Sequence, residues 1–399
     1  MDDKVVKELN ELIKQYDIDI ELLNELYQIG ENEKDFYLIK NENGEIIKEK
    51  QKLPYKFIEW LKNFKIIKYI IEIIISYKTE EPKVCGIMNA YNNCYINAAL
   101  QIFSRCYSLI IELFKCNYKE DELIELFLNS MMKLLFDKDK YYNPKEFIEC
   151  FCKKNKDFNF GKQNCSQNFI RTLLKNINDV LEKNVNNKYF PKDQKEKEAY
   201  NKFIEVNKIY PESKPYSIFS GIIKNKIEGK CPFCEEEICN YSFSSFVDQN
   251  LYLNSFSKET DLLEVLKKNI GNKNNAKMKC PYCKKKISLE SILKFIKIPE
   301  IFIFTLERYL ERNKVPIIPN EQINIFDFVD KSCSIDEKEC NYELFAINIR
   351  IGNDLSSGHE ICQIKEKNKW YTINDDKIYQ KNEKYYENNY GLFYKKIHL

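Results

Sequence analysis

Two near-identical Cys-Pro-aromatic-Cys sequences constrain this chain more than any other feature. They are Cys231-Pro232-Phe233-Cys234 and Cys280-Pro281-Tyr282-Cys283. Four thiolates from two such knuckles can form a closed tetrahedral zinc site, which is structural because it has no open position. The sequence therefore predicts that Zn²⁺ joins the two knuckles, with strand-like segments and an amphipathic run at 260–270 between them. Free thiols or a redox pair are the alternative uses of these side chains, and Cys239 is expected to be a bystander.

The balance of charge limits the partners of such a zinc module. The chain has 399 residues, and 63 Lys+Arg against 61 Asp+Glu give a net charge of +2. A protein that works mainly by coating nucleic acid is expected to be far more basic. We therefore expect no nucleic-acid partner and interpret the run Lys284-Lys285-Lys286 as a solvated tip. A zinc module that binds nucleic acid remains an alternative, with salt-dependent binding as its signature.

The cysteine content and the absence of targeting signals indicate a reducing compartment. The chain has 15 cysteines, and its first residues lack a basic stretch followed by an apolar one, so no secretory signal is expected. The most apolar stretch, 66–77, is broken by Lys68 and Glu72 and is too short to cross a bilayer. We therefore expect reduced thiols, no membrane span, and a cytoplasmic or nuclear location, or both.

Hydrophobic residues make up 44% of the chain, which is enough for a large core.

Histidine is scarce, and this narrows the candidates for acid–base chemistry. The chain has two histidines, His359 and His398. Imidazole is the usual proton carrier of hydrolytic sites near neutral pH. Because His398 is the penultimate residue, where chains tend to fray, His359 is the better candidate.

One cysteine stands where a helix is expected to begin. In the segment 86–101, Ile96, Leu100 and Phe103 fall on one helical face, and Asn92 or Asn93 is a plausible N-cap. Cys94 then lies in the first turn, where the helix dipole favours thiolate. Asn89, five residues upstream, could direct its amide at an oxyanion beside the sulfur. A buried structural cysteine at a helix start is the alternative interpretation.

The sequence around His359 predicts a β-hairpin. Two strand-like runs, 358–365 and 369–376, flank a short polar turn. Folding the chain about Lys367 places His359 opposite Asn374 or Asp375, to within about one residue of register. An Asn or Asp beside an imidazole can fix its tautomer, as in Cys-His-Asn proteases. A hairpin with an incidental histidine is the alternative.

These two segments together resemble the ubiquitin-specific proteases. The family's cysteine box runs Gly-Leu-x-Asn-x-Gly-Asn-Thr-Cys-Tyr-x-Asn-x-x-x-Gln, and this chain departs from it at Tyr91, where glycine is usual, and at Asn93, where threonine is usual. The family's histidine box has Gly-His-Tyr, a hairpin, and then Trp-x-x-Phe-Asp/Asn-Asp, and here Glu360 replaces the tyrosine. The matching residues are Asn89, Asn92, Cys94, Tyr95, Asn97, Gln101, His359, Trp370, Asn374 and Asp375.

The resemblance implies a role for each matching residue. Cys94 would be the nucleophile, His359 the general base and Asn374 the third catalytic residue. Asn89 would stabilise the oxyanion, and Asp375 would help to polarise the site. The family's fingers often carry a zinc site at the place of Cys231, Cys234, Cys280 and Cys283.

A third segment resembles the family's Gln-x-Asp-x-x-Glu-Phe-Leu sequence, whose two acids contact the arginine-bearing tail of ubiquitin. It begins at Gln163, and Cys165 and Asn168 stand at the positions of the two acids. Charge-assisted hydrogen bonds are each worth about 1.5–3 kcal/mol. The resemblance therefore implies substrate binding here, with weaker binding of ubiquitin's tail or a ubiquitin-like relative as the substrate.

Taken over residues 82–396, the resemblance implies an α+β, papain-like cysteine peptidase. A helical thumb would occupy about 82–210, zinc-binding β fingers about 215–295 and a β-rich palm about 296–396. Residues 1–81 would form a mainly helical N-terminal extension, with a hairpin over 35–47. The implied activity is hydrolysis of the peptide or isopeptide bond at the C-terminal glycine of ubiquitin or a ubiquitin-like protein, with ubiquitinated proteins as partners. A catalytically silent ubiquitin-binding scaffold of the same fold is the main alternative.

Overall fold

The computed structural model describes residues 38–40, 46–48 and 84–397, apart from 117, 119–120, 137–140, 186–188, 209–210, 309–313, 353–357, 367–368 and 381–387. The chain divides into two compact units, Met1–Lys83 and Val84–Leu399. In the first unit, strands β1 (Leu38–Lys40) and β2 (Ile46–Lys48) pair antiparallel, as expected for the hairpin predicted at 35–47. The helices predicted for residues 1–81 lie outside the described residues, as does His398.

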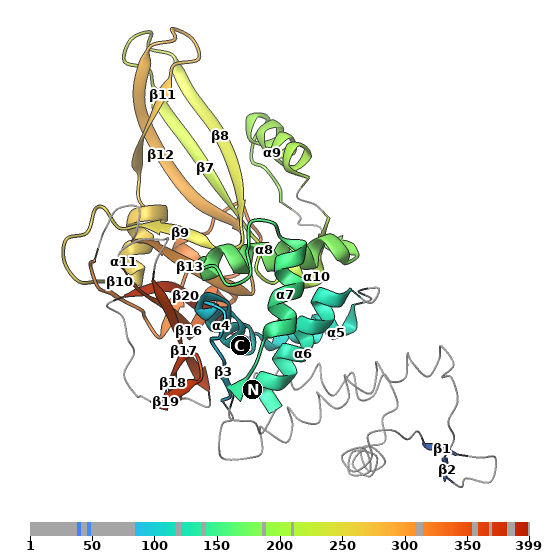
Figure 1. Ribbon diagram of the computed structural model, residues 1–399. Coiled ribbons are helices and arrows are strands. Elements are labelled where there is room, and N and C mark those ends of the chain that lie inside the picture. Colours follow the sequence, from blue (N-terminus) through green and yellow to red (C-terminus); the bar gives the residue numbers. More distant parts are fainter. Residues whose placement is uncertain are drawn as a thin grey trace. The chain divides into compact units, whose positions relative to one another are not determined.

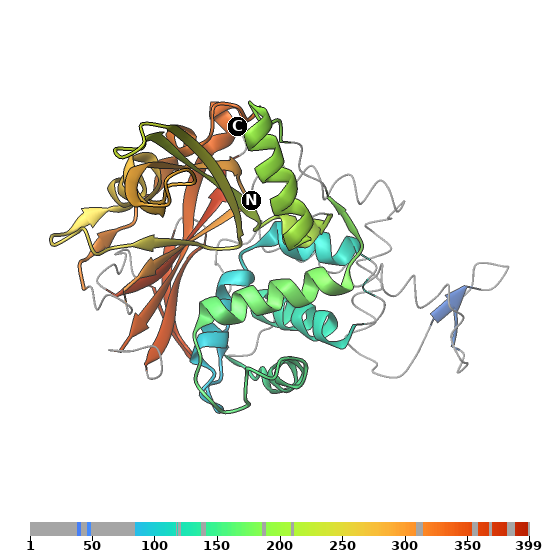
Figure 2. The same ribbon diagram turned by 90° about the horizontal axis from the view of Figure 1, so that it is seen from above.

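The second unit mixes helices and sheets, which confirms the α+β expectation. Most of its helices gather on one side of the main sheet, whereas α11 lies apart from them (Figure 2). In α8, the buried residues Phe169, Ile170, Leu173, Leu174 and Ile177 recur at helical spacing, so one face of this helix enters the core. The helices are α4 (Cys94–Phe103), α5 (Tyr107–Lys115), α6 (Glu122–Phe136), α7 (Lys145–Lys154), α8 (Ser166–Val180), α9 (Gln194–Asn207), α10 (Lys214–Ser217) and α11 (Leu262–Leu266).

An eight-stranded sheet forms the β-rich part of the body. Its strands run in the order β19-β18-β17-β16-β20-β13-β9, and β15 pairs with β16 off this path. The central strands are buried on both faces. Helices cover one face, and a cluster of buried hydrophobic residues lies on the other. The strands are β9 (Gln249–Tyr252), β13 (Ile301–Glu307), β15 (Gln322–Asn324), β16 (Asn341–Ile351), β17 (His359–Glu366), β18 (Lys369–Asn374), β19 (Lys377–Gln380) and β20 (Asn389–Lys396).

A second sheet of four long antiparallel strands projects from the body (Figure 1). Its strands, in spatial order, are β11 (Asn274–Lys279), β12 (Lys286–Lys297), β7 (Gly221–Lys230) and β8 (Glu237–Phe246). The chain between β8 and β11 leaves this sheet, because β9 pairs with β13 and α11 packs into the core of the body. The fingers segment expected at 215–295 is therefore interrupted in space by residues that belong to the body.

Short elements complete the unit. Strand β3 (Gly86–Ile87) pairs with β4 (Tyr141–Tyr142), β5 (Lys183–Val185) with β6 (Glu212–Ser213), and β10 (Thr260–Asp261) with β14 (Ile317–Ile318). One π-helical turn follows α11 at Lys267–Gly271, and 3-10 turns lie at Phe326–Phe328 and Glu337–Cys340. Among the described residues, no helix is both long and apolar enough to cross a membrane.

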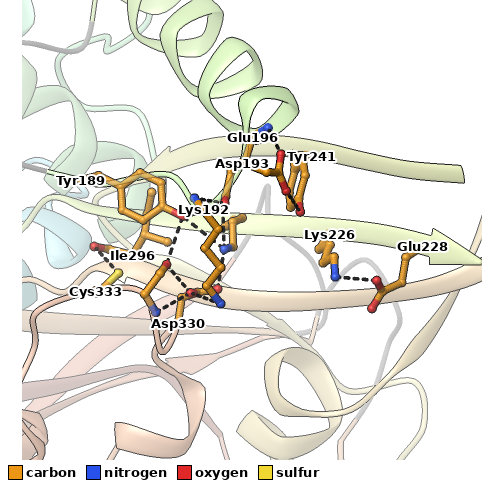
Figure 3. A network of polar contacts seen from close by, with 12 residues as sticks. Tyr189, Lys192, Asp193, Glu196, Lys226, Glu228, Tyr241, Ile296, Asp330 and Cys333 are labelled. Carbon is orange, nitrogen blue, oxygen red and sulfur yellow. Dashed lines mark hydrogen bonds and ion pairs between the residues drawn. The ribbon is translucent and has the colours of Figure 1, made fainter.

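A buried cluster of charges joins three parts of the chain at the base of the projecting sheet (Figure 3). The Nζ atom of Lys224, on β7, lies 2.6 Å from an oxygen of Glu196, on α9, and 2.5 Å from an oxygen of Asp330. Although burial raises the pKa of the Asp330 carboxyl, hydrogen bonds from Lys224 and Ser332 lower it to about 2. Because an unpaired buried charge is costly, Lys224 holds α9 and the loop at 330 against the projecting sheet.

Candidate active site

The candidate nucleophile lies at the start of the helix that the sequence predicts. Helix α4 begins at Cys94, and Asn93 occupies the N-cap position. The Asn93 side chain forms no capping bond to the helix, and its Nδ2 instead donates to the Met88 carbonyl (3.1 Å) and to Asn97 Oδ1 (2.7 Å). The backbone N–H of Cys94 belongs to the first turn, whose amides have no partner within the helix. The positive end of the helix dipole and these free amides are therefore directed at a negative charge that forms beside Cys94.

The loop before Cys94 is held in a fixed shape by asparagines. The backbone N–H of Asn93 donates to Asn89 Oδ1 (3.0 Å), and Asn92 adopts the left-handed conformation with φ of 53°. Asn tolerates this conformation better than most residues. The ring of Tyr91 packs against that of Phe160 with centroids 4.8 Å apart, so the side chain found in place of the usual glycine is accommodated beside the loop.

The candidate base lies on β17 and is oriented by the neighbouring strand. His359 Nε2 is 2.7 Å from Asn374 Oδ1, at the end of β18. Because the amide oxygen can only accept a hydrogen bond, Nε2 carries the proton and Nδ1 is left to accept one. His359 also forms a hydrogen bond with the Cys94 side chain. The two segments, which are 265 residues apart in the sequence, therefore meet.

The hydrogen bond with Cys94 is the largest influence on the imidazole. It raises the pKa of His359, as do the Asn374 amide and the negative charge of Asp375, while burial opposes them. The result is a pKa of about 9 for His359, against an ordinary value of 6.5. The imidazole is thus suited to take and hold a proton from the thiol.

Asp375 connects the two halves of the site. Its carboxylate accepts from Asn89 Nδ2 (2.9 Å) and Asn97 Nδ2 (2.8 Å), both near Cys94, and lies 3.8 Å from His359 Nε2. Its carbonyl accepts from the backbone N–H of Ile87 on β3 (2.9 Å). The turn that follows β18 is therefore fastened to the segment that leads into α4.

Gly86 permits this close approach. A Cβ atom at this position would lie 2.7 Å from the backbone oxygen of Asp376, which is closer than such atoms come. Sequence reasoning gave Gly86 no role and named Asn97 only as a matching position. Asn97 could have been found from its place one helical turn after Cys94, whereas nothing in the local sequence indicates which backbone Gly86 contacts.

The side-chain amide of Asn89 is fixed by two hydrogen bonds. One hydrogen of its Nδ2 bonds to Asp375, and its Oδ1 is held by the Asn93 backbone. The second Nδ2 hydrogen takes no part in these two bonds, and the side chain is exposed. Together with the backbone N–H of Cys94, this amide can form an oxyanion hole.

Glu360 lies on the opposite face of β17 from His359, because successive side chains of a strand point to opposite faces. It is buried and pairs with Arg350 on β16. The replacement of tyrosine by glutamate at this position therefore changes the interior behind the site. The charge of Glu360 is not among the main causes of the raised pKa of His359.

The three residues predicted to bind substrate lie at the start of α8 but differ in exposure. Gln163 and Asn168 are exposed, and Gln163 Oε1 accepts from the backbone N–H of Gly358 (3.2 Å), next to His359. Cys165 is buried at the N-cap of α8. Burial raises the pKa of its thiol.

The four knuckle cysteines come together at the tip of the projecting sheet. Cys231 Sγ lies 3.8 Å from Cys283 Sγ, and Cys234 Sγ lies 3.7 Å from Cys280 Sγ. All four sulfurs lie within 4.8 Å of one another. A tetrahedron with Zn–S bonds of about 2.3 Å has edges of about 3.8 Å, so the donor set fits a zinc ion.

The two knuckles also share one backbone conformation. Each first cysteine accepts a bond at its carbonyl from a residue four positions later, Glu235 or Lys284, and both of these residues have positive φ, 63° and 62°. Cys239 lies outside this group of four, as expected for a bystander.

Comparison with known proteins agrees with this geometry. The family model described as "Ubiquitin carboxyl-terminal hydrolase" matches residues 85–394. The chain is similar to "Ubiquitin carboxyl-terminal hydrolase 4" of Arabidopsis thaliana, with 24% identity over 327 residues, which span 75% of this chain and 86% of the relative. Since the match covers both segments that meet at the candidate site, the chain belongs to the ubiquitin carboxyl-terminal hydrolase family and carries a domain of the ubiquitin-specific protease type.

Proposed function

We propose that this protein is a cysteine-type deubiquitinase that hydrolyses the bond at the C-terminal glycine of ubiquitin or a ubiquitin-like protein. The observation that carries the proposal is the hydrogen-bonded series of Cys94, His359 and Asn374. A thiol at a helix start, an imidazole of fixed tautomer and an orienting amide are the parts that cysteine-peptidase chemistry requires.

The proposed reaction uses these groups in two stages. His359 Nδ1 takes the Cys94 proton, and the thiolate attacks the glycine carbonyl carbon to give a tetrahedral oxyanion held by Asn89 and the Cys94 amide. The imidazolium then gives its proton to the leaving lysine amine as the C–N bond breaks, which leaves a thioester. A water molecule, deprotonated by His359, attacks the thioester and releases Cys94 as a thiol once the proton returns.

Substrate would be bound by two further parts of the chain. We assign direct contact with the substrate's C-terminal tail to Gln163 and Asn168, which are exposed, and a packing role to the buried Cys165. The projecting sheet would hold the globular part of ubiquitin. A structural Zn²⁺ on Cys231, Cys234, Cys280 and Cys283 would stabilise its tip.

A covalent probe tests the proposal directly. Ubiquitin with a thiol-reactive group in place of its C-terminal carboxylate should add to the full chain under reducing conditions, with mass spectrometry placing the link at Cys94. Absence of any adduct, with binding of ubiquitin retained, would favour the silent scaffold. That alternative draws on Cys165 and Asn168, which stand where the family has acids. The reduced thiols that the proposal requires fit a cytoplasmic or nuclear location, which we also propose.

The raised pKa of His359 predicts the pH dependence of the proposed activity. Because the imidazolium must protonate the leaving amine, kcat/KM should fall as the pH rises through about 9. Asp375→Asn removes one cause of the raised pKa, so the alkaline limb of the profile should move to lower pH. The free energy of unfolding should depend on pH in the same direction. Because folding raises the pKa of His359 above 6.5, protonation of this imidazole stabilises the folded protein fully below about pH 6.5, and this contribution is lost as the pH rises through about 9.

A neighbouring residue provides the control for this pH experiment. Asp376→Asn changes an exposed carboxylate one residue away and should leave the alkaline limb in place. Profiles of kcat/KM between pH 7 and 10.5 decide the matter. An unshifted limb in Asp375→Asn would contradict the assigned electrostatic role.

A further inference from the structure

A buried ion pair that the proposed reaction does not use lies behind the site. Arg350 on β16 and Glu360 on β17 are direct cross-strand partners, and their side chains form an ion pair with about 1% of each exposed. Glu360 stands where the family resemblance implies tyrosine, so the pair is a feature of this chain. Charged side chains this deeply buried are costly unless they are paired and hydrogen-bonded.

The other contacts of the pair reach the segment 163–166, which leads into α8. The backbone N–H of Ser166 points at the Glu360 carboxylate, 3.4 Å from each oxygen. Arg350 Nη1 lies 3.5 Å from the carbonyl oxygen of Asn164. Asn348 Nδ2 donates to both Glu360 Oε2 (3.0 Å) and the Ser166 hydroxyl.

Through these contacts, the segment 163–166 stabilises the buried charges of Arg350 and Glu360, and the two charged side chains in turn hold the segment in place. Glu360 faces the first turn of the 15-residue helix α8, where the positive end of the helix dipole stabilises a carboxylate. If the segment moved away, the carboxylate would lose the Ser166 amide and this dipole. Three residues before Ser166, the side chain of Gln163 accepts a hydrogen bond from the backbone N–H of Gly358, so both ends of the segment are attached at or next to β17.

We propose that Arg350 and Glu360 are positioning residues that hold the segment 163–166 against β17 and thereby set the affinity for the substrate's C-terminal tail. The proposal rests on the proposed function only in naming that substrate. The pair acts on tail binding rather than on the chemical step, because Glu360 and His359 point to opposite faces of the strand. Loss of the pair should therefore raise KM and leave kcat and its pH profile in place.

The test compares two ligands in an inactivated background. In full-length Cys94→Ala protein, we would measure the Kd of intact ubiquitin and of ubiquitin that lacks its C-terminal tail. Glu360→Gln and Arg350→Met should each weaken binding of intact ubiquitin by about tenfold or more, as expected when buried charge-assisted hydrogen bonds are lost. Binding of the truncated ubiquitin should stay within about twofold. With Cys94 present, KM should rise by a similar factor at unchanged kcat.

Two further variants separate positioning from general stability. The double variant Arg350→Met/Glu360→Leu leaves no lone buried charge, so it should melt close to wild type and still bind intact ubiquitin weakly. Glu212→Gln breaks another buried ion pair, with Lys297, that lies outside the segment 163–166, and it should lower the melting temperature without changing either Kd.

Other results overturn the inference. The inference is wrong if the variants bind intact and truncated ubiquitin equally more weakly, or if folded variants keep the wild-type Kd values. It is also wrong if the variants lower kcat at constant KM, or if the protein without these substitutions does not bind ubiquitin. If the protein bound ubiquitin but did not hydrolyse it, the proposed function would be wrong, and the Kd comparison would still decide whether Arg350 and Glu360 position the segment 163–166.

Discussion

Cys94→Ala and His359→Ala are each expected to lower hydrolysis of a fluorogenic C-terminal ubiquitin amide by about 10⁴-fold or more. The thiol supplies the attacking atom, and the imidazole both takes its proton and returns one to the leaving group. Because the two residues act as a unit, their effects should not add, and the double variant should hydrolyse the substrate nearly as fast as either single variant. Both variants should keep the wild-type melting temperature to within a few degrees, since neither side chain fills a large volume.

A second cysteine at a helix start provides the matched control for this prediction. Cys106 occupies the N-cap of α5 and is buried, with its Sγ 3.6 Å from the Ile102 carbonyl oxygen. Burial raises the pKa of its thiol, and no histidine in the described part of the chain is among the influences on that pKa. Cys106→Ala should therefore leave hydrolysis within about twofold of wild type. Activity that survived in Cys94→Ala would remove the proposed mechanism.

The parts of the site that could be predicted from the sequence depend on local order along the chain. Helical spacing placed Cys94 at the start of α4, and the polar turn near Lys367 gave the hairpin register, since the observed pairing of Cys362 with Ile373 lies within one residue of that expected. The repeated Cys-x-x-Cys spacing likewise predicted which four sulfurs would gather.

The parts that could not be predicted depend on contacts between distant segments. Gly86 has a role only because the Asp376 backbone lies against it, and the 289 residues between them give no local signal of this. The charges of Lys224, Glu196 and Asp330 look solvated in a sequence rich in such residues, yet they are buried together. The same holds for Arg350 and Glu360. A charged side chain can be buried only where another segment supplies a partner for it. The sequence pattern of one segment does not show which distant residue that partner is.

Removal of the proposed zinc is expected to destabilise the projecting sheet strongly. Folding free energies of about 10–16 kcal/mol accompany zinc binding to isolated zinc-finger peptides, so even a fraction of this is large for a domain. The cluster at the tip of this sheet is small, with Cys231, Ile238, Cys280, Ile287 and Leu289 as its buried members. Two of its five buried members are knuckle cysteines, so the apolar contacts left without metal are few. A chelator, or Cys231→Ser, should lower the melting temperature by roughly 10 °C or more.

The control for the zinc experiment is a cysteine on the same sheet. Cys239 lies on β8, outside the group of four sulfurs, so Cys239→Ser should retain one zinc per chain by elemental analysis and the wild-type melting temperature. Cys231→Ser should lose the metal, and hydrogen exchange should rise near both knuckles. Because the tip is separate from the core that holds His359, alkylation of Cys94 should keep its wild-type rate in both variants. If Cys231→Ser instead kept full stability, the tip would be held by its strands alone, and the four thiols would need a different explanation.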